Sequence, residues 1–178
     1  MSSRARFLAI SFLAIAVSGA AIADGGFGTG AGRLLVSPDG KVLFVQSTTS
    51  GSGATRTTTE TLVALGTSGA VAWTWTSPAA IHGIAFTTGI AAVAVGGDPI
   101  RHTSAPPSQI VGLDLSTGAA AWTLTADGDV QGLEAASNGV LAVVVKEVAR
   151  TSTTLASVTR TLELITPAGV VAWTYPLD

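Results

Sequence analysis

The segment Gly118-Ala-Ala-Ala-Trp122 decides the fold, because the chain repeats it as Gly69-Ala-Val-Ala-Trp73 and as Gly169-Val-Val-Ala-Trp173. The tryptophans are 49 and then 51 residues apart. Each segment is preceded, 33, 33 and 34 residues before its tryptophan, by an earlier glycine turn at Gly40, Gly89 or Gly139. This period predicts a repeat architecture, in which a unit that cannot bury its apolar face alone stacks on its neighbours.

Each repeat has the pattern of four short antiparallel strands. Asp39-Gly40 and Asn138-Gly139 are strong hairpin signals, because a tight primed turn needs positive φ. Abundant Thr and Ser, apolar β-branched runs and few charges (11%) indicate an all-β protein. Runs such as 141–145 are apolar on both faces, which predicts sheets packed between other sheets. We expect strands at 33–37, 41–47, 60–65, 71–76, 83–87, 90–96, 109–115, 119–125, 132–136, 140–150, 158–166 and 170–175.

The first 23 residues have the pattern of a secretory signal peptide. Arg4 and Arg6 precede the apolar stretch 7–17, and small residues lead to Ala21-Ile22-Ala23. The alternative, a membrane anchor, needs about 20 apolar residues, and this stretch is shorter. We therefore predict a signal helix that is cleaved after Ala23. The mature chain 24–178 is expected to be exported to the periplasm or the cell exterior, with no transmembrane segment.

Composition excludes several functions. The chain has no cysteine, so neither disulfides nor a thiolate metal site is expected. Beyond residue 23, eleven Asp and Glu face seven Lys and Arg, which are the nine of the whole chain less Arg4 and Arg6. The resulting charge of −4, without a basic patch, predicts that nucleic acid is not a partner. Low charge favours association with itself or with another protein.

The second repeat resembles the tryptophan-docking repeat of the PQQ-like (quinoprotein dehydrogenase-type) β-propellers. That pattern runs Ala-x-Asp-x-x-Thr-Gly, three residues, Trp, and here it reads Gly112-Leu-Asp114-Leu-Ser-Thr117-Gly118 to Trp122. The other two repeats keep its glycine and tryptophan. The resemblance implies a partial propeller of three four-stranded antiparallel blades, at about 33–81, 82–131 and 132–178. In that family the tryptophan docks on the next blade, which implies structural roles for Trp73, Trp122, Trp173, Gly69, Gly118, Gly169 and Asp114.

Three blades do not make a ring. Propellers of the resembled family have about eight blades, and propellers generally have four to eight. Either further chains complete the ring, through self-association or with a protein partner, or the chain is a truncated remnant of a longer gene.

The long connections between the second and third strands of each repeat are the candidate contact surface. They are 48–59, 97–108 and 151–157, and an up-and-down arrangement of strands places them on one face. The candidate partner-binding residues in or beside them are Arg56, Arg101, His102 and Arg150.

No catalytic, cofactor or metal site is predicted. His82 lies where one repeat passes to the next, which indicates a structural role. A single histidine, His102, cannot build a zinc site, and its trio with Asp98 and Ser104 lies in one loop without support. Asp127-Gly128-Asp129 has the pattern of a turn rather than a calcium loop, and the glycines in 25–32 that of a flexible lead-in.

These observations predict an exported, non-catalytic propeller-type scaffold for binding or assembly, with contacts through the three long loops. The alternative is a fragment or partner chain of a PQQ-dependent dehydrogenase, which would hold PQQ and a divalent cation at the centre of a complete ring. No matching set of ligands is present in the sequence.

Overall fold

The structure, a computed structural model, describes residues 34–51, 57–96, 108–151 and 154–177. The predicted signal peptide lies outside these residues. Within the described part of the chain, no helix is long and apolar enough to cross a membrane.

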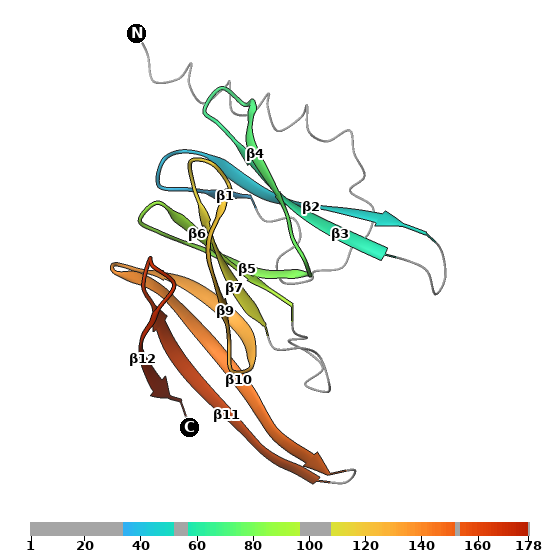
Figure 1. Cartoon of the computed structure of the whole chain (residues 1–178), viewed down its shortest axis with the longest axis vertical. Coiled ribbons are helices and arrows are strands. Elements are labelled where there is room, and N and C mark those ends of the chain that lie inside the picture. Colours follow the sequence, from blue (N-terminus) through green and yellow to red (C-terminus); the bar gives the residue numbers. More distant parts are fainter. Residues whose placement is uncertain (1–33, 52–56, 97–107, 152–153, 178) are drawn as a thin grey trace.

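Twelve strands form three four-stranded sheets (Figure 1), in which every neighbouring pair is antiparallel. The sheets follow one another in chain order, like blades of a propeller, so we name them blades one, two and three. The prediction of an all-β fold with three such sheets is confirmed. Blade one contains β1 (Leu35–Val36), β2 (Val42–Ser50), β3 (Thr57–Leu65) and β4 (Val71–Thr76). Blade two contains β5 (Ile81–Thr87), β6 (Ile90–Val95), β7 (Gln109–Asp114) and β8 (Ala120–Thr125). Blade three contains β9 (Asp129–Ala136), β10 (Gly139–Thr151), β11 (Thr154–Ile165) and β12 (Val171–Pro176).

One predicted loop is wrong. The connection expected at 151–157 is mostly strand, because β10 and β11 stay in register as far as the pair Thr151 and Thr154. The residues are rich in threonine, and β-branched side chains favour extended backbone. The predicted loop at 48–59 is likewise shortened, since β2 continues to Ser50 and β3 begins at Thr57. Both hairpins project toward the same side of the molecule (Figure 1).

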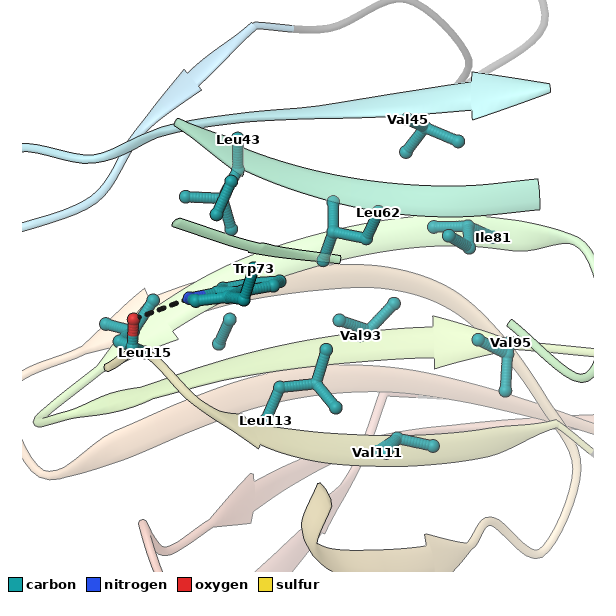
Figure 2. Close-up of a cluster of buried hydrophobic side chains, with 12 residues drawn as sticks. Leu43, Val45, Leu62, Trp73, Ile81, Val93, Val95, Val111, Leu113 and Leu115 are labelled. Carbon is teal, nitrogen blue, oxygen red and sulfur yellow. Dashed lines mark hydrogen bonds between the residues drawn. The ribbon is translucent and has the colours of Figure 1, made fainter. Parts of the chain in front are cut away.

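Blade two has an apolar core on each of its faces. Its central strand β6 is buried from Ala91 to Val95, with alternate side chains pointing to opposite neighbours. Figure 2 shows the first core, in which Val93, Val95, Val111 and Leu113 of blade two meet Leu43 and Leu62 of blade one. The second core joins Ala92, Ala94 and Ile110 to Val130, Val140 and Val144 of blade three. The expectation of a sheet covered on both faces therefore holds for blade two.

Candidate functional site: blade joints and end faces

A tryptophan fastens blade one to blade two. Trp73 on β4 is 6% exposed, and its indole Nε1 donates a hydrogen bond to the carbonyl oxygen of Leu115 at 2.9 Å (Figure 2). Its ring lies on Gly118 in the turn before β8, where an added Cβ would be 2.6 Å from the ring carbon Cδ2. Gly118 also has φ +72°, a conformation that other residues rarely adopt. Glycine is therefore required at this turn both for space and for backbone conformation.

The same arrangement fastens blade two to blade three. The indole Nε1 of Trp122 on β8 donates to the carbonyl oxygen of Pro167 at 2.8 Å. Its ring lies on Gly169, where φ is +77° and an added Cβ would be 2.5 Å from Cδ2 of the ring. Gly112, the cross-strand partner of Trp122, has no room for a side chain either, because an added Cβ would be 2.1 Å from Cε2 of the indole. Glycine in place of the alanine of the resembled motif therefore admits the ring.

The turn that receives Trp73 is one residue longer than the other two. Gly118 N donates to Asp114 O, whereas Gly69 N donates to Gly66 O and Gly169 N to Thr166 O. Leu115 and Pro167, the two indole acceptors, thus occupy equivalent positions, each directly after the first carbonyl of its turn. The equivalent position in blade one is Thr67.

Asp114 supports the longer turn. Its Oδ1 accepts hydrogen bonds from the backbone N of Ser116 at 2.8 Å and of Thr117 at 2.9 Å. Hydrogen bonds from the Ser116 hydroxyl and from Thr117 lower the pKa of this exposed carboxyl. Asp114 thus orders the turn that bears Gly118.

A second link at each joint was not found from the sequence. At the first joint, Glu60 Oε2 accepts a hydrogen bond from Ile81 N, at 2.6 Å, at the start of β5. At the second, Ser108 Oγ accepts one from Val130 N at 3.0 Å. Arg160 occupies the equivalent position in blade three, because its carbonyl accepts Leu177 N just as those of Glu60 and Ser108 accept Ser77 N and Ala126 N. Because the acceptor is a glutamate at one joint and a serine at the other, the repeats share no residue that would reveal this hydrogen bond in the sequence.

The two outer blades each present apolar side chains that nothing in the described chain covers. On blade three, Trp173 and Tyr175 of β12 are 43% and 62% exposed. They lie on the face that corresponds to the docked faces of blades one and two, because Leu164 pairs with Trp173 as Ala64 pairs with Trp73. The large exposed hydrophobic residues within the described ranges are Leu34, Val36, Val71, Val170, Trp173, Tyr175 and Leu177.

Of the four candidate partner-binding residues, the described structure includes only the backbone of Arg150. Arg56, Arg101 and His102 lie outside the described residues. Arg150 lies near the end of β10, opposite Leu155, where the predicted strand 140–150 also placed it, and its side chain is outside the description.

His82 occupies a β-bulge in β5, between Ile81 and Gly83, and its Nε2 is buried without a hydrogen-bond partner. Across the described residues, no group of three or more His, Asp or Glu side chains is placed to hold a metal ion.

Comparisons with known proteins show similarity at the level of structure. No family model matches the chain, and a search of curated proteins finds no match. BamB from Moraxella catarrhalis is 15% identical with a TM-score of 0.48, over 80% of this chain and 34% of that chain. An ACO/RPE65 chimera is 16% identical with a TM-score of 0.47, over 82% of this chain and 38% of that chain. The chain thus spans little more than a third of these structures.

Proposed function

We propose that this protein is an exported, non-catalytic assembly scaffold whose two end faces bind protein. One observation carries the proposal. Within the described residues, every large exposed hydrophobic side chain belongs to blade one, to blade three or to the residues directly flanking them, and none belongs to blade two. Blade two is covered on both faces, whereas blades one and three each pack against one other sheet of the described chain.

Exposed apolar surface of this kind marks an interaction site. Isolated hydrophobic residues on a protein surface are ordinary, but contiguous ones indicate a partner. Val170, Trp173, Tyr175 and Leu177 lie within one short stretch at the end of blade three. Their burial against a partner would be favourable by about 25 cal/mol per Å² of apolar area.

The projecting hairpins offer a second, polar contact surface. The exposed parts of β2 and β3 are lined with hydroxyls, and Thr49 and Thr58 are hydrogen-bonded across the pair at 3.3 Å. The hairpin of β10 and β11 points toward the same side (Figure 1). This supports contacts along one side of the scaffold. Two of the three connections that were predicted as contact loops, 48–59 and 151–157, consist in large part of paired strands. The alternative of a PQQ-dependent dehydrogenase fragment stays a prediction.

The size of the protein's complex in the cells that produce it tests the proposal. We expect the tagged protein, in a gentle extract, to migrate well above the mass of one chain. Tyr175→Lys should return it to the mass of one chain, because burying the lysine ammonium in an apolar contact is unfavourable unless an opposite charge pairs with it. Thr174→Lys is the matched control, since Thr174 is exposed on the opposite face of the same strand.

A wild-type protein that migrates as one chain in the extract would contradict the scaffold proposal. Export is tested separately by the amino terminus of the protein recovered outside the cytoplasm, which we expect to be Asp24. An intact amino terminus at Met1 would contradict cleavage.

A further inference from the structure

We propose that the partner of the end faces is a second copy of this chain, joined head to tail, with Trp173 of one copy docked on the Gly69 turn of the other. Two such joints close a six-bladed ring from two copies. This inference rests on the scaffold function proposed above and names the partner of the same faces.

Trp173 is equivalent to the tryptophans that, at the two internal joints, dock on a glycine turn of the next blade. In each blade the tryptophan of the last strand pairs with Ala64, Gly112 or Leu164, and a register shift directly follows that residue. The two internal tryptophans are covered by the next blade and donate to one of its carbonyl oxygens. Trp173 has the same position and is 43% exposed, with no following sheet in the described chain.

The turn at Gly69 is equivalent to the glycine turns on which those tryptophans dock. Gly69 has φ +79°, close to the +72° and +77° of the two glycines that receive a ring. Its turn is closed by the hydrogen bond from Gly69 N to Gly66 O, as the turn of Gly169 is closed by its bond to Thr166 O. Thr67 supplies the carbonyl equivalent to that of Pro167. Gly69 and Gly169 are both partly exposed, whereas Gly118 is buried.

Both faces also present exposed apolar side chains. Tyr175 and Val170 on blade three, and Val36 and Val71 on blade one, are all at least 60% exposed. A joint between blade three and blade one is heterologous, so it closes only when the accumulated rotation completes a circle. Six blades lie within the four to eight that propellers use, whereas a third copy would bring the number to nine.

At the position of Glu60 and Ser108, blade three has Arg160. The side chains of Glu60 and Ser108 each accept a hydrogen bond from a backbone N–H at the first strand of the next blade. An arginine side chain cannot accept such a bond, because it has only donors. At the internal joints that first strand follows directly along the chain, which is not so between two copies. The joint between copies therefore rests on the indole, its carbonyl acceptor and the apolar faces.

Sedimentation equilibrium of the purified protein tests the inference. We expect the mass of two chains at micromolar concentration. Trp173→Ala should raise the dissociation constant about a hundredfold or more, because a central tryptophan is commonly a binding hot spot. Gly69→Asn should do the same, since asparagine tolerates positive φ but its side chain occupies the position of the incoming ring. Thr174→Lys should leave the mass at two chains.

Mixing the two variants distinguishes the arrangement. Trp173→Ala keeps an intact Gly69 turn, and Gly69→Asn keeps an intact Trp173, so the mixture can form one complete joint. We expect the mixed pair to associate more tightly than either variant alone. Circular dichroism identical to wild type establishes that each variant is folded. Tyr175→Lys replaces a misfolded Trp173→Ala, and Val71→Lys, on the face of blade one, replaces a misfolded Gly69→Asn.

Three results would overturn the inference. The first is a wild-type protein that has the mass of one chain at tens of micromolar. The scaffold function would still hold in that case if the protein migrates in a larger complex in the cell extract. The second is loss of the dimer with Trp173→Ala but not with Gly69→Asn, because blade three then pairs with itself. The third is a mass that increases beyond two chains with concentration, because the ring then does not close.

Discussion

Trp73 and Trp173 occupy equivalent positions in their blades, so the same substitution in both measures what a joint contributes. A buried tryptophan removes about 150–250 Å² from water, which at about 25 cal/mol per Å² sets an upper bound of about 4–6 kcal/mol. Trp73 is 6% exposed and also donates to Leu115 O. Trp73→Ala opens a void between two sheets, and we expect it to lower the free energy of unfolding by about 3–5 kcal/mol.

Trp173→Ala is expected to cost less. The ring is 43% exposed, so little more than half of its area is removed from water, and its loss leaves no closed void. On the same area scale, about 85–140 Å² removed from water corresponds to about 2–3 kcal/mol for this variant.

Urea titration followed by far-UV circular dichroism gives both values, because that signal does not depend on the indole that is removed. The protein is held dilute enough to be a single chain, so that the end face is not covered by a partner. A difference below 1 kcal/mol between the two variants would refute the reasoning, because the docked ring would then add nothing to the packing within its own blade. A loss below 1 kcal/mol for Trp73→Ala would remove this residue from the docking role.

Three further substitutions test the joints and their surroundings. Gly112→Ala should lower the free energy of unfolding by about 1–3 kcal/mol, because the new methyl meets the Trp122 ring, whereas Gly132→Ala, where nothing lies within 4 Å, should not; equal urea midpoints would contradict this. Glu60→Ala should cost about 1–3 kcal/mol by leaving a backbone N–H without its acceptor, and Glu60→Gln, which keeps a side-chain oxygen, should recover most of it. Burial raises the pKa of Glu163, and repulsion from a nearby aspartate adds to the shift, so its charged form opposes folding as pH rises above the ordinary pKa of the carboxyl. Glu163→Gln should therefore raise stability at pH 7 and change it little below pH 4, and thermal unfolding at both values would show it.

The fold could be predicted because the repeat carries strong local signals at fixed spacing. Glycine is needed at Gly118 and Gly169 for positive φ, and a tryptophan four residues later has a matching position in every repeat. Hairpin dipeptides and apolar runs then place all twelve strands to within a few residues. These are short-range requirements of the backbone, which a single sequence displays directly.

The candidate site could be predicted only in part, because it depends on which surfaces lie beside one another. The sequence placed Trp173 among the docking residues, yet its exposure becomes apparent only when the sheets are stacked. The acceptors Glu60 and Ser108 share no residue type, so no repeat pattern contains them. The loop predicted at 151–157 failed because polar, threonine-rich sequence suits a solvated hairpin as well as a loop.

The unequal turns have a consequence for how such a gene can change in length. Trp73 meets the longer turn closed by Asp114, and Trp122 meets the shorter one that ends at Gly169. A recombination event that duplicated the middle unit in tandem would place Trp122 against a turn one residue longer than the Gly169 turn. Duplication or reordering of the units would therefore change which turn length each tryptophan meets.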